Sequence, residues 1–520
     1  MHFVSERRDH RLVAVGSALI ALALVAVFAL AARAQAAEKL YWDNYGSGTV
    51  GSANIDGSGG SLLNLGSEEL EQPEGMAYDT VTNRLFLPSE DAGSGHIVAI
   101  NLDGSGATSF TAPGAPIDGP EGITLDPATR TLYWENTGTE ESIAWAKLDG
   151  SAGGVLNTSG AKLEDPCCRI AIDPVGGRIY WMNFTAGKGS IAFANLNNTG
   201  GGGELSLAGS TLEPGAEGLV VDSAAGRIYF LGGNDKGVGY ANLNGSGGGD
   251  LSLGGAPLNT AWGLALDPGT GRIYWGNEGN DEDPANAFGF VGTNGSGAGG
   301  ISIAGAPVAH PQDPLIIKSP SGTGAPAIAR DSANPAALSC STGNWAADYP
   351  GSLVYQAPRT YGYQWLLNGA AVAGATAGTL TATQAGSYTC TVIATNQSGS
   401  ASQTSTTATA VSAAKVKLTV KPKKAKAKAG KTAKFKVQAL NQGDLQTGNA
   451  KLCVKVPKKA KKALKAPKCK KLGVVAALTT RTAKLKIKVK KSAAKGNYKV
   501  TLQVKGSAGK TVKATVKVLG

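Results

Sequence analysis

Histidine is scarce in this chain of 520 residues, which holds four copies, at His2, His10, His96 and His310. The first two fall within an N-terminal segment, residues 1–36, that has the features of a removable export signal. The remaining two are too few for a metal site with three histidine ligands in one chain. No Ser-His-Asp triad is supported by their positions either.

Aromatic residues make up 6% of the chain, and no long stretch shows the 3.6-residue apolar period of an amphipathic helix. Glycine is abundant instead, with 73 copies, many of them in Asp-Gly and Asn-Gly pairs. Such pairs supply the positive φ that tight hairpin turns require. The composition therefore predicts an all-β protein made of many short strands.

Acidic residues almost disappear from residue 415 onward. This segment has 31 Lys and Arg481 against a single acid, Asp444, a formal charge of +31. The rest of the chain has 18 basic and 37 acidic residues, a formal charge of −19. The total of +12 thus hides two oppositely charged parts.

Lysine alternates with apolar residues in this basic segment, as in Ala433 to Val437 and Ala483 to Val489. A period of two predicts strands with one wet face, and so a lysine-coated β-sandwich over residues 412–520. The pattern is similar to the CARDB-type adhesion modules of bacterial surface proteins. The lysines could serve solubility and protection of strand edges, or attachment to an anionic cell-wall polymer, lipid surface or nucleic acid. Sequence-specific nucleic acid is disfavoured, because arginine and interleaved aromatics are nearly absent.

A different pattern recurs earlier in the chain, where a short apolar strand ends in an aromatic-apolar pair six times. Taken from the first residue of each pair, the spacings are 45, 47, 47, 49 and 45 residues. The pairs are Tyr41-Trp42, Phe86-Leu87, Tyr133-Trp134, Tyr180-Trp181, Tyr229-Phe230 and Tyr274-Trp275. This period predicts repeated small sheets that stack on one another.

Each pair after the first follows, by seven residues, an Asp that ends another apolar run, as with Asp267 and Tyr274. With a third and a fourth strand per unit, the pattern predicts a six-bladed β-propeller over residues 37–318. The first unit lacks its first strand, and residues 315–317 are expected to supply it and close the ring.

The propeller segment resembles the YWTD (class B) repeats of the low-density-lipoprotein-receptor family. The match consists of Leu-Ala-Leu-Asp267, Arg272-Ile-Tyr-Trp275 and Leu148-Asp-Gly-Ser151. The receptor Asp that follows Tyr-Trp-Thr is replaced, at Asn44, Asn136, Asn183 and Asn277 among others. Ligand-binding residues of the receptors therefore do not transfer.

Six cysteines in an exported chain suggest disulfides, and they fall into the pairs Cys340–Cys390, Cys453–Cys469 and the adjacent Cys167–Cys168. The adjacent pair could form a vicinal disulfide or remain as buried thiols.

Residues 319–411 match the Cys…Trp…Cys pattern of an immunoglobulin-like domain, with Trp365 between the cysteines and Tyr388 two residues before Cys390. Its expected role is that of a spacer.

At the N-terminus, three arginines precede an apolar run over residues 12–32 and then Ala34-Gln-Ala36. This predicts a signal peptide over residues 1–36 and a secreted or cell-surface protein, with no other transmembrane span. An uncleaved membrane anchor is the alternative.

The symmetry of a propeller places equivalent residues of its repeats on a ring near one end of its central channel. One such position lies five residues before each strand-ending Asp. Its occupants are Glu74, Glu121, Cys168, Glu217, Trp262 and, in the closing copy, Asp313. The carboxyls could simply bond backbone N–H groups, could bind a cationic or sugar ligand or Ca²⁺, or could do acid–base chemistry with a metal, as in gluconolactonase-like propellers. A second possible Ca²⁺ loop is residues 280–283.

The sequence thus favours a binding or adhesion protein with no catalytic residues. Its propeller is expected to recognise a protein or glycan, and its basic domain to attach to an anionic wall polymer. A metal-dependent propeller hydrolase or lactonase with appended binding domains is the alternative.

Overall fold

The computed structural model describes residues 38–90, 95–185, 188–279, 287–303, 305 and 307–520. The predicted signal peptide, residues 1–36, and the acidic loop at residues 280–283 lie outside these residues. Within them, no helix has the length and apolar character needed to cross a membrane. The chain is all-β and divides into two compact units. One runs through Ser321 and includes 345–360 and 394–401; the other holds the remaining residues up to Gly520.

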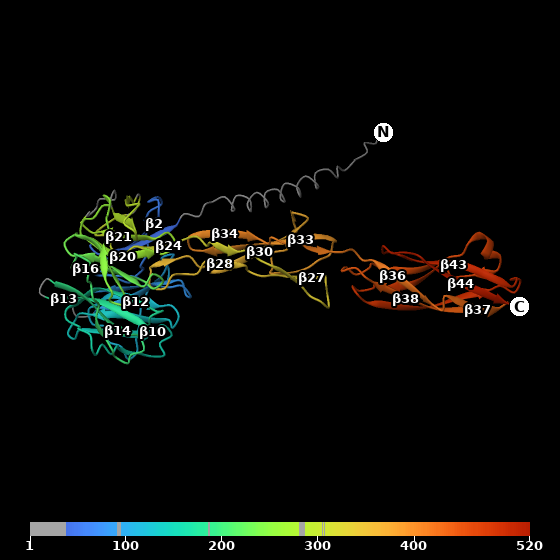
Figure 1. Ribbon diagram of the computed structural model, residues 1–520, viewed down its shortest axis with the longest axis horizontal. Helices are drawn as coiled ribbons and strands as arrows, with labels where there is room; N and C mark the ends of the chain where they lie inside the picture. Colours follow the sequence, from blue (N-terminus) through green and yellow to red (C-terminus); the bar gives the residue numbers. More distant parts are fainter. Residues whose placement is uncertain (1–37, 91–94, 186–187, 280–286, 304, 306) are drawn as a thin grey trace, which may run out of the picture. The chain divides into compact units, whose positions relative to one another are not determined.

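Six four-stranded antiparallel blades form the propeller (Figure 1). The first three blades contain β24 (Leu315–Ile317), β1 (Lys39–Asn44), β2 (Thr49–Asn54) and β3 (Ser61–Leu62); β4 (Ala77–Asp79), β5 (Arg84–Ser89), β6 (His96–Asn101) and β7 (Thr108–Ser109); and β8 (Pro120–Asp126), β9 (Thr131–Asn136), β10 (Ser142–Lys147) and β11 (Gly153–Val155).

The other three blades follow the same order from the innermost to the outermost strand. They contain β12 (Pro166–Asp173), β13 (Arg178–Thr185), β14 (Lys188–Asn195) and β15 (Gly203–Glu204); β16 (Pro214–Asp222), β17 (Arg227–Gly232), β18 (Gly237–Asn242) and β19 (Gly248–Asp250); and β20 (Ala261–Asp267), β21 (Arg272–Asn277), β22 (Phe288–Gly292) and β23 (Gly299–Ile301).

The predicted ring closure is confirmed. β24 pairs antiparallel with β1, and Tyr41 lies opposite Leu315. A short strand, β29 (Val354–Tyr355), then adds to β24 in parallel, so residues predicted to belong to the immunoglobulin-like domain extend the first blade. The outermost strands are short, and β15 spans only Gly203–Glu204.

The aromatic pairs are core residues. Four tryptophans of the repeat are fully buried: Trp42, Trp134, Trp181 and Trp275. The asparagine two residues later explains the departure from the receptor pattern. Asn136 Oδ1 accepts a hydrogen bond from the Trp134 indole at 3.1 Å, and its Nδ2 donates to the Pro116 carbonyl at 3.2 Å. An aspartate could accept the first bond but could not donate the second.

The strand-ending aspartates hold the blades together. Asp79 accepts a hydrogen bond from the Val81 N–H in its own turn and forms an ion pair of 2.6 Å with Arg130 of the next blade. Asp267 likewise forms a 2.6 Å ion pair with Lys318, just after the closing strand. At these two positions the repeat Asp therefore ties neighbouring blades, and Asp79 also caps a turn.

Between the propeller and the basic segment, short strands surround the fully buried Trp365 and the Cys340–Cys390 disulfide. Tyr388 donates its hydroxyl to the Gln384 carbonyl at 2.9 Å. The strands are β25 (Gly322–Gly324), β26 (Ile328–Arg330), β27 (Ala337–Cys340), β28 (Asn344–Trp345), β30 (Thr360–Leu367), β31 (Ala370–Ala371), β32 (Thr379–Thr381), β33 (Gly386–Asn396), β34 (Gly399–Thr404) and β35 (Thr409–Val411). The immunoglobulin-like assignment itself stays a prediction.

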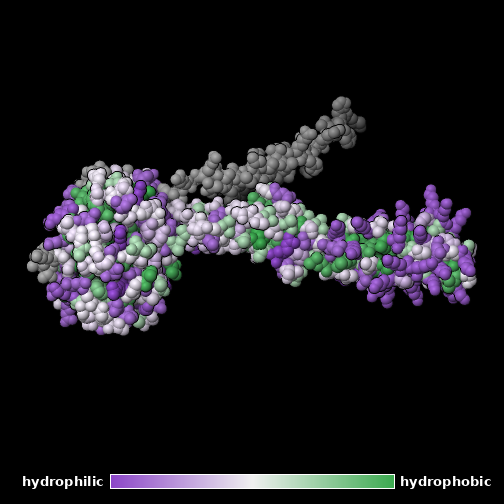
Figure 2. Space-filling view, in the orientation of Figure 1, coloured by the Kyte–Doolittle hydropathy of each residue, from purple (hydrophilic) through white to green (hydrophobic). Residues whose placement is uncertain are grey.

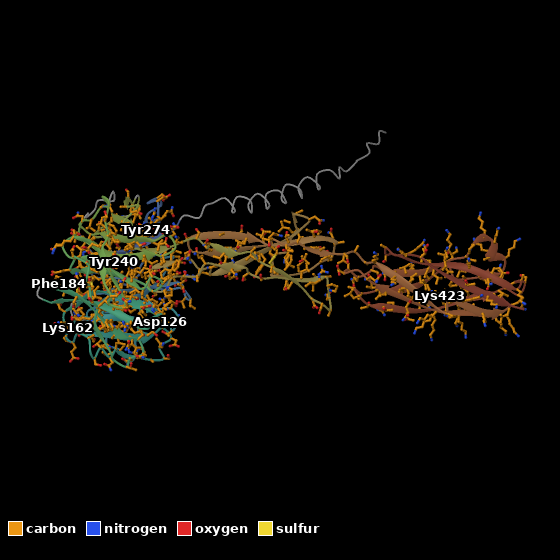
Figure 3. All side chains as sticks on the ribbon, viewed as in Figure 1. Asp126, Lys162, Phe184, Tyr240, Tyr274 and Lys423 are labelled. Carbon is orange, nitrogen blue, oxygen red and sulfur yellow. A yellow bond between two sulfur atoms is a disulfide. The ribbon has the colours of Figure 1, made fainter. Side chains whose placement is uncertain are left out.

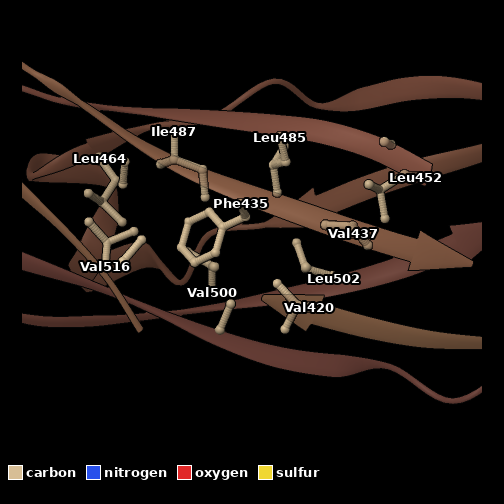
Figure 4. Packing of buried hydrophobic residues seen from close by; sticks show 14 of the residues in the cluster. Val420, Phe435, Val437, Leu452, Leu464, Leu485, Ile487, Val500, Leu502 and Val516 are labelled. Carbon is tan, nitrogen blue, oxygen red and sulfur yellow. The ribbon is translucent and has the colours of Figure 1, made fainter. Parts of the chain in front are cut away.

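The basic segment is a two-sheet sandwich. One sheet has the order β36-β38-β42-β40 and the other β37-β44-β43-β39-β41. Figure 4 shows Phe435 among Ile487, Leu485 and Val500 in its core. The elements are β36 (Val416–Lys421), β37 (Lys424–Lys428), β38 (Thr432–Asn441), β39 (Ala450–Lys455), the short helix η2 (Lys458–Lys462), β40 (Leu464–Lys465), β41 (Cys469–Gly473), β42 (Thr480–Val489), β43 (Gly496–Lys505) and β44 (Val512–Leu519).

Candidate functional site

The ring residues sit at or just before the first strand of each blade. Glu121, Cys168 and Trp262 lie in β8, β12 and β20, while Glu74 lies three residues before β4 and Asp313 two residues before β24. Glu217 lies in β16, and its side chain is outside the described residues. Glu74, Glu121, Cys168 and Asp313 are buried, with at most 8% of their surface exposed.

Arg169 links several of these residues. Its Nη2 lies 2.8 Å from Asp313 Oδ2 and donates to Gln312 Oε1 at 3.0 Å. Its guanidinium carbon lies 5.2 Å from the centroid of the Trp262 ring, within cation–π range. Because Arg169 is 4% exposed, this one side chain carries a buried positive charge into the ring.

Glu121 is held by two donors. Its Oε2 accepts from the Cys168 N–H at 3.1 Å, and its Oε1 accepts from Thr137 Oγ1 at 2.9 Å. Burial raises the pKa of Glu121 to about 7, although the hydrogen bond from Thr137 opposes the shift. Glu121 therefore bonds a backbone N–H group, which is one of the roles that the sequence predicts for the ring carboxyls.

Cys167 and Cys168 form a vicinal disulfide, and the other two expected disulfides are also present. The two sulfurs lie with one carboxylate oxygen each from Glu74 and Glu121 in a group whose atoms are all within 4.8 Å of one another. Since both sulfurs are bonded to each other, they are not thiolate ligands in this state. The carboxylates are the groups that could hold a cation here.

Sequence reasoning missed three residues of this cluster: Arg169 as a site residue, Asp43 and Glu135. Asp43 and Glu135 are 0% exposed. The repeat alignment contains the signal for all three. Arg169 stands where other copies have glycine, and Asp43 and Glu135 occupy the position directly after the repeat tryptophan.

The glycines at the Arg169 position show how crowded this end of the channel is. A Cβ on Gly122 would lie 2.4 Å from Glu135 Oε2 and 2.8 Å from the Arg169 nitrogen. A Cβ on Gly263, whose φ is +61°, would lie 2.3 Å from Asp313 Oδ1. Glycine lets the strands approach closely enough to bring these charged side chains together.

The carboxyls of the cluster differ in how they are compensated. Burial raises the pKa of Asp313, while the positive charge of Arg169 opposes the shift. Burial raises the pKa of Glu74 well above its usual range, with Arg169 opposing. Burial, and then the charge of Glu121, raise the pKa of Glu135 well above its usual range.

No protein-family model and no curated protein sequence matches the chain. Among solved structures, the chain is similar to one from a nidogen/laminin complex, with 18% identity, a TM-score of 0.42, and coverage of 54% of this chain and 98% of that one. It is also similar to TolB from Acinetobacter baumannii, with 15% identity, a TM-score of 0.39, and coverage of 54% and 66%. A gluconolactonase from Xanthomonas campestris matches with 15% identity, a TM-score of 0.33, and coverage of 47% and 84%. Likenesses of this size transfer no ligand, partner or reaction to this chain.

Proposed function

We propose that this chain is a secreted or cell-surface binding protein. Its propeller is a recognition scaffold for a protein or glycan, and its lysine-coated sandwich attaches to an anionic cell-wall polymer. The observation that carries the proposal is the arrangement of lysines on that sandwich.

The lysines of the sandwich form an outer layer over an apolar core. Along β38, Lys434 and Lys436 are exposed, while Ala433, Phe435 and Val437 are buried. Figure 2 shows hydrophilic residues over much of the C-terminal sandwich with hydrophobic residues between them, and in Figure 3 many side chains that end in nitrogen extend outward from it. The charged layer is thus fixed by the strands themselves.

Many of these lysines face one another across neighbouring strands. Lys434 lies opposite Lys486, and Lys436 opposite Lys484, in the β38–β42 pair. Like charges directly opposite one another destabilise a sheet. Solubility alone would be served by a surface of mixed sign. The lysine layer has one sign and destabilises the sheet that carries it. This favours an external polyanion as the source of the neutralising charge.

The protein supplies little compensation for this charge. The segment's single acid, Asp444, pairs with Arg330 at 3.1 Å. Among the residues that the structure describes, no ion pair joins a lysine of this sandwich to a carboxylate. Attraction to a polyanion is therefore left to these side chains, and salt should screen it.

The hydrolase alternative needs carboxylates that substrate can reach. Glu74, Glu121 and Asp313 are buried, and Arg169 occupies the space among the ring residues. This favours a scaffold over a catalytic channel.

The test is binding of the full chain to purified anionic wall polymer, compared with a neutral glycan. The double variant Lys434→Gln with Lys486→Gln should bind more weakly. The matched control, Lys162→Gln with Lys236→Gln on exposed propeller sites, should bind like wild type. Equal loss in both variants, or no binding by wild type, would contradict the attachment role.

A further inference from the structure

The channel end of the propeller has more buried negative groups than positive ones. Five carboxyls lie there with at most 8% exposure: Asp43, Glu74, Glu121, Glu135 and Asp313. Arg169 is the only cation described among them, and it pairs with Asp313. Isolated buried carboxylates are costly unless a counter-charge or a proton neutralises them.

Asp313 and Asp43 have partners of their own, Arg169 at 2.8 Å and the Gly75 N–H at 3.1 Å. Glu74 and Glu135 are left with unpaired oxygens. No hydrogen-bond donor reaches either oxygen of Glu135, or Oε2 of Glu74, among the described residues. Glu135 is 0% exposed and Glu74 is 7% exposed, so water replaces few of the missing partners.

Glu74 and Glu121 are close enough to act on one ligand, and Glu135 lies beside them. One oxygen each of Glu74 and Glu121 lies in the group whose atoms are within 4.8 Å of one another. Glu135 Oε2 packs at the backbone of Gly122, the residue next to Glu121. The charges of Glu121 and Glu74 both act on Glu135. Carboxyl groups from three positions in two blades therefore lie near one another, and those of Glu74 and Glu135 include oxygens without donors.

We propose that Glu74, Glu121 and Glu135 bind one hard divalent cation, for which Ca²⁺ is the probe, inside the propeller channel beside Arg169. Carboxylate oxygens are the ligands that such a cation prefers. The cation supplies the positive charge that the glutamates lack and, at Glu74 and Glu135, binds oxygens that have no donor. The Cys167–Cys168 disulfide borders the site without acting as a ligand.

The proposal does not depend on the wall-polymer role. Binding the cation to the folded state alone raises stability with cation concentration. The bound cation therefore connects the first strands of blades two and three to β9 and stabilises this end of the channel.

The test uses the full chain, stripped of metal with a chelator and titrated with Ca²⁺ by calorimetry. One equivalent should bind, and the thermal midpoint of the propeller should rise with Ca²⁺. Glu135→Gln should weaken binding about 10- to 100-fold. The metal-free variant should be at least as stable as the metal-free wild type, because a buried charge without a partner is removed. Glu74→Gln provides a second variant with the same expectation.

Glu204→Gln is the matched control, since Glu204 is exposed and pairs with Lys162 at 3.6 Å. It should bind like wild type. A double variant of the acidic loop, Asp281→Asn with Asp283→Asn, should also bind like wild type. Absence of binding by folded wild type, binding of Zn²⁺ but not Ca²⁺, or loss only in the loop variant would overturn the assignment.

Discussion

Arg169 and Asp313 form a buried ion pair of 2.8 Å between the start of the fourth blade and the segment that closes the first. Arg169 belongs to β12, and Asp313 lies two residues before β24. The pair therefore connects blades across the channel, in addition to the strand pairing that closes the ring. The pair also links the closing segment of the ring to the buried charges at the channel end.

Replacing Arg169 should destabilise the propeller strongly. Arg169→Met leaves the carboxyl of Asp313 buried without its cation, and breaking a buried pair in this way costs about 3–5 kcal/mol. Urea unfolding followed by tryptophan fluorescence measures the loss. Arg178→Met, which removes a contact of 4.4 Å with the Phe193 ring and no buried ion pair, is the control and should cost about 1 kcal/mol. Adding Asp313→Asn to Arg169→Met should recover part of the loss; no recovery would argue against a charge effect.

Restoring the receptor-type aspartate should harm this protein. Asn136→Asp places a carboxylate oxygen against the Pro116 carbonyl, which now accepts from Asn136 Nδ2 at 3.2 Å. We expect a loss of about 1–3 kcal/mol in the free energy of unfolding. Asn197→Asp is the control, because Asn197 is exposed and caps a turn that Asp56 and Asp103 cap elsewhere. Similar stabilities for the two variants would show that the Asn136 amide has no such role.

The Asp79–Arg130 pair should make propeller stability depend on acid. Burial raises the pKa of Asp79, but hydrogen bonds from Arg130 and Thr82 outweigh it and hold that pKa below its usual range. A depressed folded-state pKa contributes stability above the unfolded value of about 3.9, and this contribution is lost as the pH falls through the folded value. Asp79→Asn should be less stable than wild type near neutral pH, and the difference should shrink below about pH 4. A constant difference over that range would contradict the assignment.

Stability and attachment should move in opposite directions on the lysine layer. Lys434→Glu replaces a like-charge pair with Lys486 by an opposite-charge pair, which should stabilise the sandwich by about 0.2–1 kcal/mol. The same variant should bind anionic polymer more weakly. Denaturant unfolding and polymer binding are measured on one preparation. A gain in both properties would mean that the lysines are not arranged for a polyanion.

The repeat register made the ring closure predictable, because residues 315–317 stand where the next strand is due. The same register located the ring residues and contained the signals for Arg169, Asp43 and Glu135. Their contacts could not be read from it, because the direction of a long side chain across a channel depends on packing in three dimensions. The addition of β29 to the first blade also left no pattern, since two residues are too few to show a period.

The lysine-coated strands were predicted closely because alternation of lysine and apolar residues has only one regular solution. A shift by one residue would bury every lysine of β38 and expose Phe435. The sequence sets the charge of this surface but does not specify which anionic ligand binds to it.

The salt dependence of binding to purified anionic wall polymer tests the proposed attachment most directly. The full chain should bind at low salt and lose affinity steadily as salt rises, because the contacts are between exposed lysines and fixed anions. Lys434→Gln with Lys486→Gln should show a shallower dependence. Affinity that does not change with salt, or the absence of binding at low salt, would contradict the account.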